Sequence, residues 1–264
     1  MKNKKQKILI LSDLKESTTS ILKSTVSIAK MINCEVEFFH VKKATDVVER
    51  ESQLSAVRNI KDKYLEIDKA IQNVLQPINQ SYNVNIKYSI AFGNVKALID
   101  NYISKHKPDI IVMGKRKSKA LKLNRDSITN FVLNKYKGSV LLFSDIIQLE
   151  PNKPLSVGLL NNSENRIPNE FIHSLMNYSQ KPLKSFSVVK NSKKESRSVA
   201  SDYKTVEYVF EAGDNSISNL SNYISRNKVN LLCFDRSINK SESNELNLNE
   251  IINKLNVSLL LTAN

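Results

Sequence analysis

Residues 92–115 read FGNVKALIDNYISKHKPDIIVMGK, and this stretch decides the fold class. After its first glycine, apolar residues recur at three- and four-residue steps from Val95 to Ile103, which is the period of an amphipathic helix. The dipeptide Lys107-Pro108 ends that helix, because proline disfavours helical backbone in the residue before it. The apolar run Ile110–Met113 then predicts a buried strand that stops at a second glycine.

Strands and helices alternate on both sides of this stretch. The predicted strands are Lys7–Leu14, Glu35–Val41, Val84–Ala91, Ile110–Met113 and Ser139–Phe143. Besides the helix after residue 93, the predicted helices are Ser17–Asn33, a long amphipathic segment over residues 54–78, and about Ser127–Tyr136. Pro77 lies where we expect the long helix to end. Such alternation predicts a parallel sheet with helices on both faces, because parallel strands need a crossover of helix length.

An internal repeat extends this interpretation to the whole chain. Residues 101–111, NYISKHKPDII, align without gaps on residues 222–232, NYISRNKVNLL, at an offset of 121 positions. We therefore predict two tandem Rossmann-like α/β domains, residues 1–149 and 154–264, each with a five-stranded, mainly parallel sheet. The second domain is predicted to be smaller, because the polar segment 190–203 replaces the long amphipathic helix.

The composition excludes several functional classes. Five glycines, none of them clustered, exclude a P-loop or a dinucleotide fingerprint. Two cysteines and three histidines cannot supply a closed zinc site of the usual spacing. The longest apolar runs are far shorter than the ~20 residues of a membrane span. Ser12 and Asp13 interrupt the apolar run after the basic start, so we expect no export signal and a cytoplasmic protein.

The chain resembles the universal stress protein family in a tandem, two-domain form. The resemblance rests on Ile8–Leu14 (ILILSDL), on His40-Val41 at the end of the second strand and, above all, on residues 92–115. It implies an adenine nucleotide alpha hydrolase-like fold, a cytoplasmic location and dimeric assembly. In that family the last strands pair across a twofold axis. A tandem chain can satisfy this pairing internally, through Ser139–Phe143 and Val257–Leu261, which makes an intramolecular pseudo-dimer and leaves a homodimer open.

The resemblance also places a nucleotide site in the first domain, in a degenerate form. ATP-binding members carry G-x-x-G, nine residues and then G-[S/T] after the fourth strand. Here Gly114 fits the first glycine and Lys117 falls at the second. The third falls on Ser127, or on Asp126 if Asp126-Ser127 replaces the Gly-Ser pair. A side chain at such a position restricts positive φ and fills the space that a phosphate would need. Asp235 replaces even the first glycine in the second domain, so we expect that domain to have lost the site.

Each candidate site residue also has a structural interpretation. Asp13, at the end of the first strand, matches a nucleoside contact or caps the following helix, and Asn161 takes its place in the second domain. Val41 offers backbone groups to an adenine ring or simply packs in the core. Ser127 binds a phosphate or caps a helix.

The basic residues have two interpretations as well. The run that begins at Lys115 and includes Lys117 forms either an anion grip or, more often for such runs, a solvated surface. The net charge of +14 favours an anionic partner, yet this run lacks the aromatic residues on which bases stack, so nucleic acid is disfavoured.

The sequence thus favours a non-enzymatic cytoplasmic universal stress protein that acts in the stress response by binding a protein partner, without cofactor or metal. The alternative is ATP binding, with or without slow hydrolysis, in the first domain. Its residues are Asp13, Val41, Gly114, Lys115, Lys117 and Ser127.

Overall fold

The computed structural model describes residues 5–43, 53–115, 128–150, 153–161, 170–189, 204–236 and 247–263. In the first half the strands are β1 (Lys7–Ser12), β2 (Glu35–Lys42), β3 (Lys87–Phe92), β4 (Ile110–Gly114) and β5 (Ser139–Phe143). The helices of that half are α1 (Thr18–Ile32), α2 (Gln53–Tyr82), α3 (Val95–His106) and α4 (Ile128–Lys135). Strands and helices alternate as predicted, with boundaries within a few residues.

The second half repeats this order. Its strands are β6 (Val157–Leu160), β7 (Leu183–Val189), β8 (Thr205–Glu211), β9 (Leu231–Asp235) and β10 (Ser258–Thr262). Its helices are α5 (Glu170–Asn177), α6 (Ser216–Arg226) and α7 (Leu248–Lys254). The segment 190–203, predicted as a loop in place of the long helix, lies outside the described residues, as do residues 151 and 152 at the predicted domain boundary. That boundary therefore stays a prediction.

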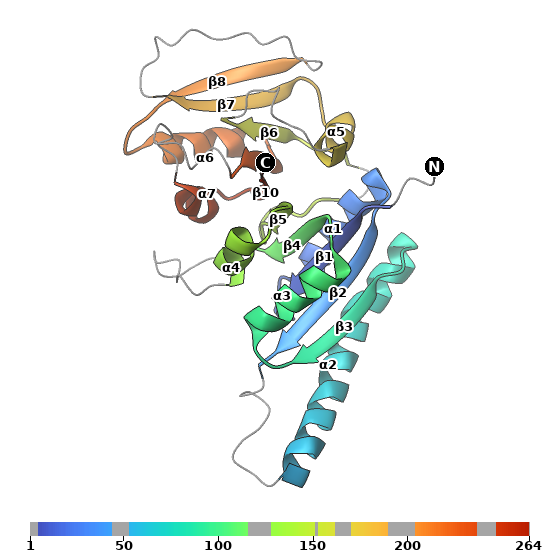
Figure 1. Ribbon diagram of the computed structural model, residues 1–264. Coiled ribbons are helices and arrows are strands. Elements are labelled where there is room, and N and C mark those ends of the chain that lie inside the picture. The colour runs from blue at the N-terminus through green and yellow to red at the C-terminus, as the bar shows by residue number, and fades with distance from the viewer. Residues whose placement is uncertain are drawn as a thin grey trace.

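One sheet runs through both halves (Figure 1). In the described part of the chain its strand order is β3-β2-β1-β4-β5-β10-β9-β6-β7-β8. Within each half all neighbouring strands are parallel, and β5 and β10 pair antiparallel, with Leu141 opposite Leu260. This is the pairing of last strands that the resemblance implies. The five-stranded halves are therefore mirrored in order about the junction of β5 and β10, which we call the seam.

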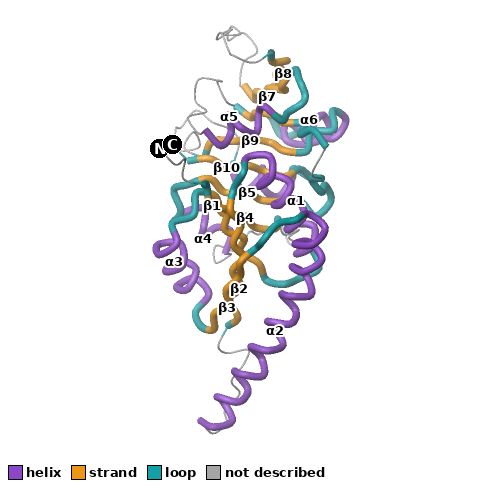
Figure 2. The backbone as a smooth tube through the Cα atoms, turned by 90° about the vertical axis from the view of Figure 1, so that its right-hand side faces the viewer, coloured by secondary structure: helices purple, strands orange, loops and turns teal. Residues whose placement is uncertain are grey.

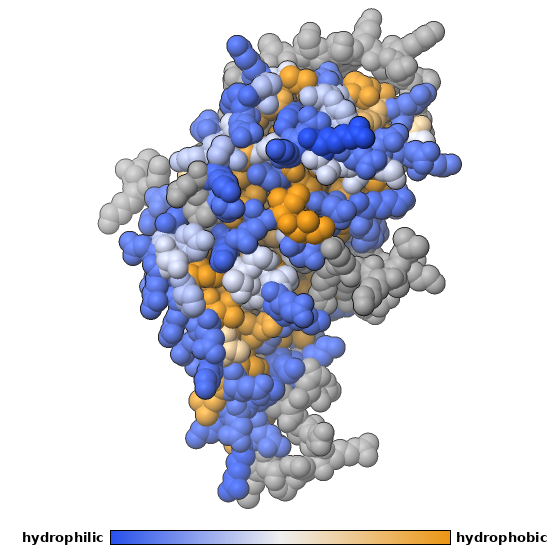
Figure 3. All heavy atoms as spheres, turned by 180° about the vertical axis from the view of Figure 1, so that it is seen from behind, coloured by the Kyte–Doolittle hydropathy of each residue, from blue (hydrophilic) through white to orange (hydrophobic). Residues whose placement is uncertain are grey.

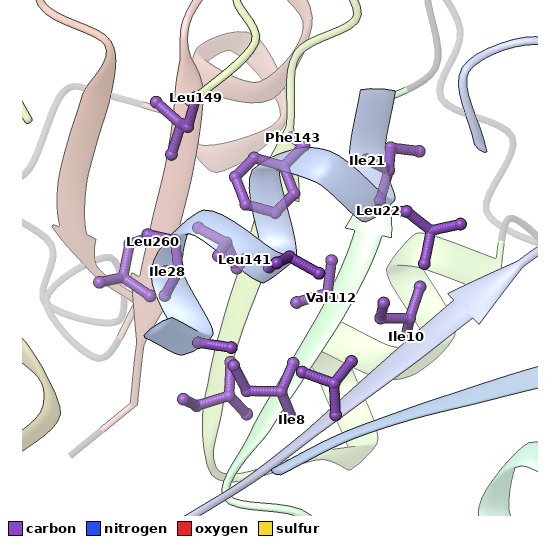
Figure 4. Close-up of a cluster of buried hydrophobic side chains, with 14 of the residues drawn as sticks. Ile8, Ile10, Ile21, Leu22, Ile28, Val112, Leu141, Phe143, Leu149 and Leu260 are labelled. Carbon is purple, nitrogen blue, oxygen red and sulfur yellow. The ribbon is translucent and has the colours of Figure 1, made fainter. Parts of the chain in front are cut away.

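Helices cover both faces of the sheet and define two cores. Figure 2 shows α3 and α4 on one side of the first half and α1 and α2 on the other. Each core continues across the seam, because buried residues of both halves belong to the same cluster. On the α1 side, α1 also contacts α5. Figure 4 shows this core, with strand residues Ile8, Ile10, Val112, Leu141 and Phe143 beneath Ile21, Leu22 and Ile28 of α1, and with Leu149 and Leu260 in the same cluster.

The interpretation of Pro77 as the end of the long helix is wrong. Helix α2 continues through Pro77 to Tyr82. A proline inside a helix costs about 3 kcal/mol, because it removes one hydrogen bond and its ring crowds the preceding turn. Ile78 follows the proline and is buried in the same core as Ile71 and Leu75. Burying a side chain of this size contributes about 1.5–3 kcal/mol, which offsets much of that cost.

The two edge strands differ on the face that α2 covers in the first half. On β3, Tyr88, Ile90 and Phe92 pack against the α1-side core. On β8, Tyr208 and Phe210 pack against the opposite core, so Glu207 and Val209 lie on the α1 side by strand alternation. The hydroxyl of Ser187 donates to the Glu207 carboxylate at 3.4 Å on that face. On this face β8 thus carries a hydrogen-bonded carboxylate and an exposed valine, where β3 carries residues that pack against the core.

The outer surface is largely polar. On the face that Figure 3 shows, hydrophilic residues cover most of the area and hydrophobic residues gather in separate patches. None of the helices in the described ranges combines the length and apolar character needed to cross a membrane.

Candidate functional site

The carboxyl end of β1 carries the first predicted site residue. It lies where the strand order reverses, between β1 and β4, and ligands of open α/β sheets bind at such a switch point. The Ser12 hydroxyl accepts a hydrogen bond from the Leu14 N–H at 3.1 Å and lies 3.2 Å from the Thr18 hydroxyl. The Asp13 carboxylate is 37% exposed and lies 3.7 Å from the Lys15 ammonium. A partly exposed carboxylate therefore stands at the expected edge of the sheet.

The end of β2 lies beside this turn. His40 is opposite Ser12 in the sheet, and its Nδ1 lies 2.9 Å from the Ser12 carbonyl oxygen. Burial lowers the pKa of His40, and the hydrogen bond to Ser12 opposes that shift only in part. Its ring therefore packs as a neutral group and fixes the end of β1. Val41, the next residue, is half-buried and packs against the core on the α3 side, as its structural interpretation expects.

Close packing accounts for the glycine at the end of β4. A Cβ atom added to Gly114 would lie 2.6 Å from Cδ1 of Ile21, which is a severe overlap. The φ angle of Gly114 lies outside the left-handed region, so the backbone conformation does not by itself demand glycine. Gly114 thus lets α1 approach β4, and the Ile21 side chain occupies the space beside it.

Lys115 turns away from this edge and reaches into the second half. Its backbone N–H donates to the Phe143 carbonyl at 2.7 Å, which continues the pairing of β4 with β5. Its ammonium donates to the carbonyl of Leu255, the C-cap of α7. A cation at a helix C-terminus satisfies carbonyls that lack a helical partner and interacts favourably with the helix dipole.

Arg236 makes the reciprocal contact, and the sequence analysis missed it. It follows β9 as Lys115 follows β4, at the repeat offset of 121 positions. Its guanidinium donates to the carbonyls of Leu133 at 2.6 Å, Tyr136 at 3.2 Å and Gly138 at 2.6 Å, all at the end of α4 or the start of β5. We call Lys115 and Arg236 the clasp. The signal in the sequence was the basic residue directly after the fourth strand of each copy.

The structure thus separates the predicted site residues into groups. Asp13 and Gly114 lie at the carboxyl edge of the sheet, Val41 lies at the end of the neighbouring strand, and Lys115 is directed to the seam. Lys117 and Ser127 lie outside the described residues, so their roles stay predictions. In the second half Asp235, which replaces the glycine, is fully buried in β9 beside Arg236. Within the described ranges no three metal-ligating side chains gather into a cluster.

Comparisons with known proteins agree with this geometry. A model of the universal stress protein family matches residues 5–144. The fold is similar to a universal stress protein from Archaeoglobus fulgidus, with a TM-score of 0.69, 14% identity and coverage of 97% of this chain and 96% of the other. It is also similar to a putative universal stress protein from Pseudomonas aeruginosa, with a TM-score of 0.58, 11% identity and coverage of 98% and 93%. No curated protein matches the chain.

The packing of Gly114 predicts a specific rescue. Gly114→Ala should lower the free energy of unfolding by about 1–3 kcal/mol, because the new methyl group overlaps the Ile21 side chain. Ile21→Val removes the overlapping Cδ1 atom, so Gly114→Ala should cost less in that background. Urea denaturation of the four proteins measures this coupling. Equal costs in both backgrounds would show that the glycine serves something other than the approach of α1.

The clasp lysine predicts a dependence of stability on pH. Burial lowers the pKa of Lys115 from its ordinary 10.5 to about 8, although Asp145 opposes the shift. Between these pH values the unfolded chain holds a proton that the folded chain has released, so stability rises with pH. The free energy of unfolding of the wild type should therefore rise relative to that of Lys115→Met as the pH increases from 8 to 10.5. If urea denaturation shows the same pH dependence for the wild type and Lys115→Met, the assignment is contradicted. Lys135→Met is the control, because the side chain of Lys135 is exposed.

Proposed function

The chain belongs to the universal stress protein family, and from this premise we propose that it acts in the stress response by binding a protein partner rather than by catalysis. The proposal places it in the cytoplasm, with its two halves held as an internal pseudo-dimer.

The proposal rests on one observation, which is what the residue directly after the fourth strand of each half contacts. In this family the phosphate-binding loop begins there, as the sequence comparison implies. In this chain Lys115 and Arg236 instead hold the opposite half through backbone carbonyls. The Ile21 side chain also occupies the space beside Gly114. These contacts support a protein in which the start of the old nucleotide loop has become part of the internal framework.

Helix α2 supplies a surface suited to a protein partner. Its apolar stripe is buried on the sheet at Ile67 and Ile71, and it continues towards the N-terminus of the helix through Tyr64, Ile60 and Val57. These last three side chains are 44%, 38% and 66% exposed. Figure 1 shows this part of α2 extending beyond the sheet. Apolar residues at such helical spacing are the usual anchors of a helix that docks in a partner's groove.

ATP binding in the first half is the second candidate. It is favoured by the position of the Asp13 carboxylate, partly exposed at the switch point of the sheet. For ATP binding, Lys115 would have to leave the Leu255 carbonyl to reach a phosphate group, and any hydrolysis would be slow.

Thermal unfolding with Mg²⁺ and ATP separates the two candidates. A ligand at about a hundred times its dissociation constant adds about 2.7 kcal/mol to the free energy of unfolding. Partner binding without a nucleotide predicts an unchanged melting temperature at millimolar ATP. If ATP raises the melting temperature of the wild type and of Asp13→Ala alike, ATP binds elsewhere. If Asp13→Ala abolishes the rise, ATP binding at this site is established and the proposal of partner binding without a nucleotide is overturned.

Site-specific photocrosslinking in stressed cells tests the partner surface. A photoreactive phenylalanine analogue at position 64 should give a discrete crosslinked protein, because Tyr64 lies in the exposed part of the α2 stripe. Position 178 is the matched control, since Tyr178 is 48% exposed in the second half. Ile60→Asp should remove the adduct at position 64. Identical adducts at both positions, or none at position 64, would contradict a partner on α2.

A further inference from the structure

The second half contains a hollow that no feature of the candidate site uses. It measures about 380 Å³ and is lined by residues of β8 and α6, two elements that contact each other. Its lining consists of Phe210 from β8 and of Asn219, Asn222, Tyr223 and Arg226 from α6. The α6 residues follow helical spacing, so they share one face of the helix. The volume falls at the lower end of the range for small-molecule sites.

The internal repeat shows how the residues around this hollow differ from their equivalents in the first half. At the offset of 121 positions, Asn219 corresponds to Leu98 of α3. In the first half Leu98 fills the space beside the turn glycine, since a Cβ atom at Gly93 would lie 3.2 Å from the Leu98 Cδ1 atom. A Cβ atom at Gly213, the equivalent glycine, would meet no atom of the described residues within 4 Å outside its own chain neighbours. Asn219 lines the hollow, so the replacement of leucine by asparagine makes this part of its wall polar.

The tyrosines at equivalent positions of α3 and α6, Tyr102 and Tyr223, also differ in their surroundings. Tyr102 of α3 stacks on Phe39 and on His106, with centroid distances of 3.9 Å on each side. Its hydroxyl also donates to the Glu37 carboxylate at 2.5 Å, so both faces and the polar group of this ring are occupied.

Tyr223, the counterpart of Tyr102, has different surroundings, and its side chain is hydrogen-bonded to that of Tyr208. It meets Tyr208 at a tilt of 53° and Phe210 edge-on at 76°. Asn227 takes the place of the stacking His106. Among the described residues, no ring is stacked parallel on Tyr223. Tyr223 thus lines a hollow in the second half, whereas both faces of Tyr102 are covered in the first.

The side chains around the hollow have complementary chemistry. Phe210 and Tyr223 offer aromatic surface to a planar group, which binds through offset or edge contacts. The guanidinium of Arg226 is exposed and suits a carboxylate or phosphate, which it can bind through two parallel hydrogen bonds. The amides of Asn219 and Asn222 can donate and accept hydrogen bonds between these two regions.

We propose that the hollow between β8 and α6 is a binding site for a small molecule that joins a planar ring to a carboxylate or phosphate group. The proposal concerns the second half alone, because in the first half Leu98 stands at the position of Asn219 and the ring of Tyr102 is stacked on both sides. It shares no residue with the candidate nucleotide site or with the α2 stripe, so it stands independently of the proposed function.

Backbone amide NMR on the full chain tests this site, with phenyl phosphate as the probe. At millimolar concentration phenyl phosphate should shift amide signals of α6 and β8. Benzoate should shift the same signals, whereas phenol and inorganic phosphate, which each carry one of the two features, should shift them less. Signals at Asp13 and Gly114 report the other edge of the sheet, so binding at the nucleotide site is distinguished directly.

Three variants decide whether the shifts arise in the hollow. Asn219→Leu restores the side chain of the first half and should abolish the shifts, as should Arg226→Gln. Lys105→Gln is the matched control, because Lys105 occupies the position of Arg226 in α3, and it should leave the shifts unchanged. The dispersed spectrum of each variant verifies its fold. The proposal is overturned if wild-type α6 and β8 signals do not move, or if they move equally in Asn219→Leu and Arg226→Gln.

Discussion

The antiparallel pairing of β5 with β10 is the constraint on which the rest of the structure depends. Without it, each half would end in a largely apolar strand with unpaired backbone groups, and such an edge promotes aggregation. All five residues of β5 and of β10 are buried. The pairing joins two parallel sheets into one and lets each hydrophobic core continue from one half into the other. The seam therefore makes the two repeats a single structural unit.

The clasp follows from this geometry. Once β5 and β10 are paired, the residue after β4 faces the end of α7, and the residue after β9 faces the end of α4. Helix ends carry carbonyl groups without helical partners, and cations satisfy them. Burial lowers the pKa of both side chains, to about 8 for Lys115. Arginine starts from a much higher pKa and stays charged when buried, and its guanidinium serves several carbonyls at once.

The two halves share the same arrangement of strands but differ in the residues around it. The mirrored strand order shows that both halves keep the same arrangement of strands. Residues at some equivalent positions on the helices and edge strands differ. The long helix α2 covers apolar Tyr88 and Ile90 in the first half. In the second half the equivalent face carries Glu207 and Val209, and the ring at position 223 borders a hollow rather than a stack. The two halves thus differ in the chemistry of this face and in the surroundings of the equivalent tyrosine.

The sequence by itself determined the fold class, the repeat and the approximate elements, because hydrophobic periodicity and turn residues are local properties. The strand Ser139–Phe143, for example, was predicted at its observed bounds. The error at Pro77 has a tertiary cause, since the burial of Ile78 holds the helix beyond the proline.

Only the tertiary structure decided what the candidate residues contact. Lys115 appeared as part of a basic run, and the sequence did not indicate that a carbonyl 140 positions away would hold it. Gly114 matched a phosphate-loop glycine, yet the approach of Ile21 is what requires it. Such contacts join residues that are distant in the chain, and their geometry depends on how helices and strands pack, which residue order alone does not specify.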